Sequence, residues 1–155
     1  MNSPLPSHLL ERQHREIDAG ILDMVEGRGS IAALAQSLAL LRRHLYLEEA
    51  VLFPPLEQAG LTMPIFVMQR EHGQMWPVLE RLEFLCRAGE PADEALRADC
   101  GDLLDQLQIH NPKEEQIVYA AADRLQAERG DASLVEAMAG ATVPEGWACA
   151  RAQVA

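Results

Sequence analysis

The sequence predicts an all-α fold, an up-down-up-down four-helix bundle, and three observations indicate it. Apolar residues recur every three or four positions along four long segments, which places them on one face of a helix. Short links containing glycine or proline separate these segments, as in antiparallel helical bundles. No stretch alternates apolar and polar residues over the length of a strand. We therefore expect four helices around one core, and no sheet.

The first two helices are expected over about residues 8–26 and 31–53. Ser7 is a candidate N-cap for the first, since its hydroxyl can accept from a free backbone N–H group. Pro54 and Pro55 are expected to end the second, because proline lacks an N–H donor and clashes with the preceding turn. The apolar positions facing inward are Leu10, Ile17, Ile21 and Met24 on the first helix, and Leu34, Leu38, Leu41 and Val51 or Leu52 on the second.

The last two helices are expected over about residues 63–88 and 92–129, the fourth ending near Gly130. Pro77 and Pro112 fall inside them, and we expect a kink at each rather than a break. The inward positions are Ile65, Met68, Met75, Leu79, Leu82 and Cys86 on the third helix, and Leu96, Cys100, Leu103, Leu107, Ile117 and Ala121 on the fourth.

The length and composition suit one domain. A chain of 155 residues that is 48% hydrophobic can bury one core but not two. We expect residues 1–130 to form the four-helix domain. Residues 131–155 should add a short helix and a tail draped over the surface, for which the sequence indicates no chemistry.

The charge excludes two classes of partner. Thirteen Lys and Arg against 24 Asp and Glu give a formal net charge of -11, which repels nucleic acids and anionic membrane surfaces. No segment has the run of about 18 apolar residues that spans a bilayer, and the N-terminus lacks a signal-peptide pattern. The three cysteines are odd in number and lack CxxC spacing. We expect a soluble, cytoplasmic protein.

Polar residues occupy inward positions on all four helices. A buried carboxylate without a cation or strong donors costs several kcal/mol, so two in one core require an explanation. Bound metal is the simplest, because imidazole and carboxylate groups are common metal ligands. The candidate ligands, one histidine per helix and two glutamates, are His14, His44, His72, His110, Glu48 and Glu114.

Counting residues from each turn places the histidines in one layer. His14, His44 and His72 come out level, and His110 differs by about 3 Å at a rise of 1.5 Å per residue. Each glutamate follows its histidine by four residues and lies on the same helix face. Both carboxylates are then displaced in the same direction, where they can bridge two ions held by the four imidazoles.

An internal repeat strengthens this pattern. HLYLEEAVLF and HNPKEEQIVY share a histidine, two glutamates, aliphatic residues and a final aromatic residue at matching positions. A single inward histidine is more often an ordinary core residue that bonds a backbone carbonyl. That interpretation does not account for four histidines in one layer with two buried glutamates. An ion-pair network does not account for them either, because the inward positions offer no Lys or Arg.

These residues resemble the hemerythrin-like, or HHE cation-binding, family over about residues 8–128. The motifs that carry the resemblance are His44-x-x-x-Glu48-Glu49 and His110-x-x-x-Glu114-Glu115. It implies a bundle with a non-heme di-iron centre, whose bridging ligands are the two glutamates and whose terminal ligands are the four histidines named above. Oxygen-carrying members have a further histidine where this chain has Trp76, which argues against an oxygen-carrier role.

Neighbouring residues have simpler interpretations. Glu49 and Glu115 are expected to be surface charges or acceptors for the ligands. Phe53 and Tyr119 are expected to cover the site, and a hydrogen bond from Tyr119 to a bound ligand is the alternative for that residue. His8 is expected to be solvated.

The expected cofactor is a pair of non-heme iron ions, with manganese or zinc as alternatives of the same ligand preference. The leading functional hypothesis is binding or sensing of O2 or NO in oxygen, nitrosative or iron-stress handling. One alternative is a di-iron oxidoreductase that reduces O2 or peroxide. Another is an interaction module that metal merely stabilises.

Overall fold

The computed structural model, which describes residues 4–152, confirms the all-α prediction: these residues form helices and no strand. In chain order the helices are α1 (Pro6–Val25), α2 (Ile31–Tyr46), the π-helical η1 (Leu47–Leu52), α3 (Phe53–Gln58), α4 (Thr62–Arg87), α5 (Glu94–Lys113), the π-helical η2 (Glu114–Val118), α6 (Tyr119–Arg129) and α7 (Ser133–Gly140).

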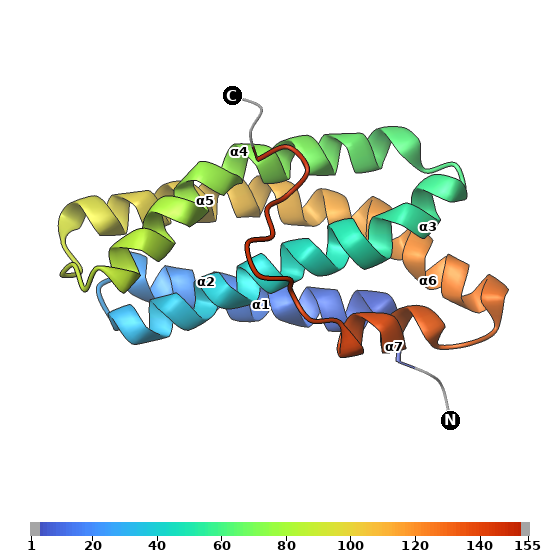
Figure 1. Ribbon diagram of the computed structural model, residues 1–155, viewed down its shortest axis with the longest axis horizontal. Helices are drawn as coiled ribbons and strands as arrows, with labels where there is room; N and C mark the ends of the chain where they lie inside the picture. The colour runs from blue at the N-terminus through green and yellow to red at the C-terminus, as the bar shows by residue number, and fades with distance from the viewer. Residues whose placement is uncertain (1–3, 153–155) are drawn as a thin grey trace.

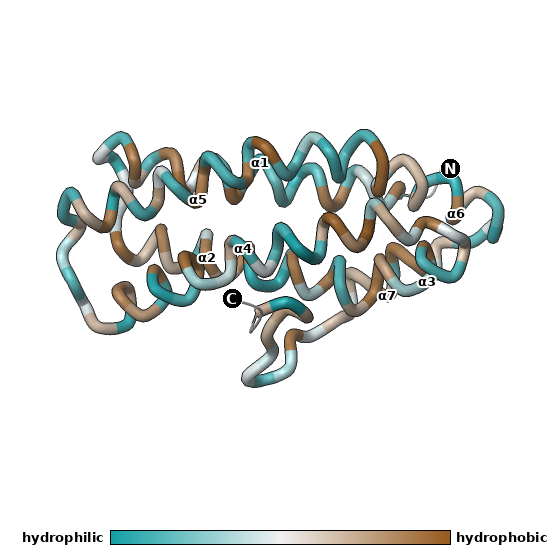
Figure 2. Tube along the Cα trace, turned by 90° about the horizontal axis from the view of Figure 1, so that it is seen from above, coloured by the Kyte–Doolittle hydropathy of each residue, from teal (hydrophilic) through white to brown (hydrophobic). Residues whose placement is uncertain are grey.

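Four continuous helical rods form the bundle (Figure 1). They are α1, α2 with η1 and α3, α4, and α5 with η2 and α6. Each rod packs against the one before it and the one after it, and the last returns to contact α1. Hydrophilic and hydrophobic residues alternate along each helix (Figure 2). The chain therefore has the up-down-up-down order that the sequence predicts.

Two separate hydrophobic clusters make up the core. One surrounds Leu41, Leu79 and Leu103, and the other surrounds Leu52 and Met68. The four inward histidines belong to neither cluster, and they lie between the two along the rods. A buried polar layer thus divides the core.

Two helix starts carry side-chain caps. Ser30 Oγ accepts from the Ala33 backbone N–H at 3.0 Å, and an Asp93 carboxylate oxygen accepts from Leu96 N–H at 2.8 Å. The prediction for Ser7 is wrong, because α1 already begins at Pro6.

Ser7 bonds across the bundle instead. Its N–H donates to Asp123 Oδ1 at 3.0 Å, and its hydroxyl donates to Asp123 Oδ2 at 2.6 Å. This side chain therefore joins the first rod to the last.

Proline does not end any of the rods. The second rod continues through Pro54 and Pro55 to Gln58, so the prediction that it stops there is wrong. Both prolines lie in the first turn of α3, directly after η1, and the first turn of a helix tolerates a missing N–H donor. Pro77 and Pro112 lie inside continuous helices, which confirms that neither breaks its helix.

The π-helical segments shift the buried face by one residue. Ile117 is 45% exposed, whereas Val118 and Ala122 are fully buried, so the predicted inward positions Ile117 and Ala121 are wrong. A π-helical turn holds one more residue than an α-helical turn. Every inward position after Glu114 therefore moves one place along the chain.

The chain ends in α7 and an extended tail. The tail crosses the bundle from α7 to α4 (Figure 1), as the sequence predicts for a draped segment. The proposed division at residue 130 stays a prediction. Within residues 4–152, no helix is long and apolar enough to cross a membrane.

Candidate metal centre

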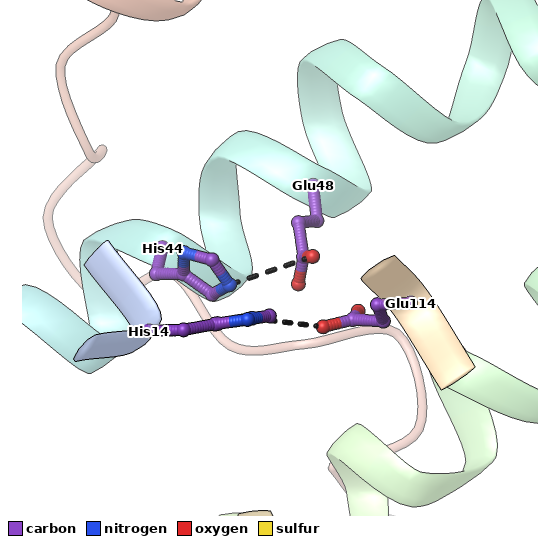
Figure 3. Close-up of side chains that lie close together, drawn as sticks. All are labelled: His14, His44, Glu48 and Glu114. Atoms are coloured by element: carbon purple, nitrogen blue, oxygen red, sulfur yellow. Dashed lines mark ion pairs between the residues drawn. The ribbon is translucent and has the colours of Figure 1, made fainter. Parts of the chain in front are cut away.

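The six predicted site residues meet in the polar layer. They form a first group of His14, His44, Glu48 and Glu114 and a second group of Glu48, His72, His110 and Glu114. In each group one ligand atom per residue lies within 4.8 Å of the others. The two glutamates belong to both groups. Figure 3 shows the first group, with His44 facing Glu48 and His14 facing Glu114.

All six side chains are removed from solvent, and both glutamates are 0% exposed. His14 Nε2 lies 3.2 Å from Glu114 Oε1, and His44 Nε2 lies 3.4 Å from Glu48 Oε2. In the second group, His110 Nε2 lies 3.0 Å from Glu114 Oε2 and His72 Nε2 lies 3.3 Å from Glu48 Oε1. The carboxylates thus face two histidines on each side.

Each residue of the second group has one buried side-chain atom without a hydrogen-bond partner. These atoms are Glu48 Oε1, His72 Nε2, His110 Nε2 and Glu114 Oε2. Buried polar atoms are nearly always satisfied, and each exception needs a cause. Here four unsatisfied atoms converge from three rods. Their chemistry, two imidazole nitrogens and two carboxylate oxygens, fits a divalent cation.

Every histidine in the layer uses its Nδ1 atom for a hydrogen bond to a side-chain oxygen. The pairs are His14 with Glu115 at 3.4 Å, His44 with Gln13 at 2.8 Å, His72 with Glu49 at 2.7 Å and His110 with Glu71 at 2.8 Å. Such a bond keeps the proton on Nδ1 in a neutral imidazole. The Nε2 lone pair is then free for a metal, an arrangement found around most metal-bound histidines.

The acceptors follow the internal repeat. Glu49 and Glu115 each follow a candidate ligand glutamate, and both accept from the histidine of another rod. The sequence left open whether Glu49 and Glu115 are surface charges or acceptors for the ligands. Both are acceptors.

Gln13 and Glu71 were missed as acceptors. Each directly precedes a histidine, so aligning RQHRE with REHGQ would have paired them. One copy of the repeat alone does not identify Gln13 or Glu71 as an acceptor, because each accepts from a histidine on a different helix.

The π-helical segments shape the site. The Phe53 N–H donates to the Glu48 carbonyl oxygen, and the Tyr119 N–H donates to the Glu114 carbonyl oxygen. In such a π-helical hydrogen bond the two residues are five apart, and they lie on nearly the same face of the helix. Phe53 accordingly stacks on His72, with ring centroids 5.8 Å apart, and Tyr119 points into the first group.

The Tyr119 hydroxyl contacts all four residues of the first group. It donates to Glu48 Oε2 at 2.6 Å and lies 2.9 Å from His14 Nε2, 3.2 Å from His44 Nε2 and 3.3 Å from Glu114 Oε1. The sequence pattern predicted that Tyr119 covers the site, but it did not place the hydroxyl among the candidate ligand atoms. Its oxygen is close enough to share an ion with this group, which makes the two groups unequal.

The layer favours positive charge. Burial acts to lower the pKa of His72, but contacts with Glu114, Glu48 and Glu49 outweigh it, and this pKa lies well above its usual value. Burial acts to raise the pKa of Glu114, yet His110, His14 and His72 hold it well below the usual range. Protons or metal ions can supply this charge.

The pKa of the Tyr119 hydroxyl is also shifted, in the direction that keeps this group neutral. Burial and then the charges of Glu114 and Glu48 raise the pKa of its hydroxyl well above the usual value. In the metal-free protein it is therefore a phenol. A bound cation reverses such local pKa shifts.

A small cavity reaches the second group from the surface between α4 and α5. It measures about 120 Å³ and is lined by Glu71, Gln74, Met75, Gln106, Ile109 and His110. Its rim includes Ile109, which is 68% exposed. A water molecule occupies about 30 Å³ in the liquid, so a diatomic molecule or peroxide fits in this cavity.

Two other residues singled out in the sequence lie elsewhere. His8 is exposed on α1, as expected. Trp76 is 2% exposed and packs edge-on against Trp147 of the tail, with ring centroids 5.5 Å apart. Its indole N–H can donate but cannot bind a metal.

Comparison with known proteins gave one match. The sequence model for the hemerythrin HHE cation-binding domain matches residues 5–122. The searches of curated proteins and of solved structures gave no match.

Proposed function

Because this chain belongs to the hemerythrin HHE cation-binding family, we propose that its polar layer binds two non-heme iron ions bridged by Glu48 and Glu114. The observation that carries the proposal is the convergence of four buried, unpartnered ligand atoms in the second group. Manganese and zinc accept the same ligands and are the alternatives. The six proposed ligands are His14, His44, Glu48, His72, His110 and Glu114.

We further propose that the centre takes up O2 or NO, in oxygen, nitrosative or iron-stress handling in the cytoplasm. Iron in such a site supplies redox chemistry and affinity for these molecules. The chain supplies four oriented imidazoles in a buried layer and a cavity that His110 helps to line. The cavity is large enough to admit these small molecules.

Reduction of O2 or peroxide is the second candidate. The Tyr119 hydroxyl, which donates to Glu48 inside the layer, favours it, because a buried donor beside the site can hold a proton for a reduced oxygen atom. Trp76 provides no imidazole, so the reduced protein should react with O2 without storing it.

The test is the optical spectrum of reduced, iron-loaded protein after mixing with O2 or with NO. The proposal predicts a spectral change with each gas. Ile109→Trp, which narrows the cavity, should slow both changes, whereas Ile117→Trp, on another exposed surface, should not.

The competing functions give different results. Sustained consumption of peroxide would favour the oxidoreductase. A protein that unfolds on chelation but shows no spectral response to either gas would favour a metal-stabilised interaction module.

A further inference from the structure

The C-terminal tail, residues 141–152, contacts a residue of the polar layer, and we call it the C-terminal strap. The backbone N–H of Ala150 donates to Glu49 Oε1 at 2.8 Å. The other oxygen, Oε2, lies 2.7 Å from His72 Nδ1. One carboxylate therefore connects the strap to a candidate metal ligand.

Several contacts fix the strap to the bundle. Arg42 Nη1 donates to the Trp147 carbonyl at 2.7 Å, and the Arg42 guanidinium lies over the Trp76 ring, 4.6 Å from its centroid. Trp147 itself packs edge-on against Trp76. Cys149 is 4% exposed within the core cluster that includes Trp76. The strap is thus a packed part of the molecule.

Gly73, the residue after His72, accommodates the strap. A Cβ atom at this position would lie 2.7 Å from both Cβ and the carbonyl oxygen of Arg151. Glycine inside a helix is less stable than alanine, because it loses more backbone freedom on folding. The close approach of the strap gives a physical reason for glycine at this position.

The repeat supplies an internal comparison. Glu115 accepts from His14 as Glu49 accepts from His72. The Glu115 side chain is 35% exposed, however, and its oxygen lies 3.4 Å from His14 Nδ1. The Glu49 side chain is 6% exposed and its bond is 2.7 Å long. The half of the layer that contacts the strap therefore has the shorter and more shielded bond.

We propose that the C-terminal strap positions His72 for metal binding by holding Glu49 through the Ala150 N–H. Glu49 is a positioning residue, since it acts through His72. The inference rests on the proposed function, because it concerns a ligand of the second group. It predicts that releasing the strap weakens one ion and spares the one bound by His14 and His44.

Ala150→Pro is the most selective variant. Ala150 is the second residue of a turn closed by a bond from the Ala152 N–H to the Cys149 carbonyl at 3.1 Å, and proline is favoured at that position. The substitution removes the N–H donor and suits the turn. Ala150→Gly keeps the donor and is the matched control.

Two readouts test the idea. Nitrogen-15 NMR of the metal-free protein reports which nitrogen of His72 carries the proton. Titration with Co(II) reports the affinity of each ion. We expect Ala150→Pro to change the His72 signals and to weaken one of the two ions about tenfold or more, the usual effect of losing a group that orients a ligand. Ala150→Gly should match the wild type.

Equal NMR signals and equal Co(II) affinities in both variants would overturn the proposal. If the wild type bound no pair of ions, the proposed function would fail, but the His72 signals would still test the strap. Should Ala150→Pro not fold, Gly73→Ala displaces the strap and must give the same change in His72. Its control is Gly101→Ala, where an added Cβ meets nothing within 4 Å.

Discussion

At the scale of single residues, only the histidines inside the polar layer should contribute to metal binding. His110 is 2% exposed and its Nε2 atom has no hydrogen-bond partner, whereas His8 is exposed. His110→Ala should therefore remove the ion of the second group, while His8→Ala should leave the metal content unchanged. Elemental analysis of the purified variants measures this, and equal losses would mean that the ligand layer is wrong.

Tyr119 tests the difference between the two groups. If its oxygen shares an ion with the first group, the ferric protein should show a phenolate-to-iron absorption band in the visible range. Tyr119→Phe should abolish that band and weaken only the ion of His14 and His44. Identical spectra and identical metal affinities in the two proteins would exclude Tyr119 as a ligand.

The titration of His110 predicts how pH affects the metal-free protein. Burial opposes its protonation, but the contacts with Glu114 and Glu71 prevail and raise the pKa of His110 from its usual 6.5 to about 9. A raised folded-state pKa stabilises the protein below the unfolded value, and that stability is lost as the pH rises through the folded value. The free energy of unfolding should thus fall between about pH 6 and about pH 10.

Thermal melting of chelated protein at several pH values measures this trend. A melting temperature that rises over the same range would contradict the assignment of charge to the layer. Glu48 and Glu114 do not obscure the trend, because their lowered pKa values keep both charged throughout it.

At the scale of helices, stability and metal binding should be separable. Asp93 caps α5, and by the rise of 1.5 Å per residue it lies about 25 Å along the helix from His110. Asp93→Ala should cost about 1 kcal/mol and lower the melting temperature by about 2–4 °C, without loss of metal. Asp102→Ala, on the same helix without a cap bond, is the control. A loss of metal from the Asp93 variant would show that the site depends on distant helix ends.

The helices also show where sequence reasoning succeeded and failed. Apolar spacing located all four rods and their inward histidines, since that spacing follows from the regular turn of an α-helix. It did not locate η1 and η2, because a π-helical turn breaks the same regularity. That is why Ile117 was placed inward and why Tyr119 was not placed among the ligand atoms.

At the scale of the whole molecule, the chain consists of two related hairpins with different surroundings. Counting residues from each turn predicted that the four histidines and two glutamates meet, and they do so. The repeat supported that prediction. The repeat did not predict that the strap contacts the site, because residues 141–152 have no counterpart in the first half of the chain. Their contact with Glu49 depends on tertiary packing alone.

The central claim is that the polar layer binds a bridged pair of ions, and the metal content of protein produced with iron tests it most directly. Elemental analysis with native mass spectrometry should find two iron ions per chain, one for each group. The double variant Glu48→Ala, Glu114→Ala should lose both, because the two groups share these carboxylates. A wild-type protein without metal, or one tightly bound ion that survives in the double variant, would contradict the claim.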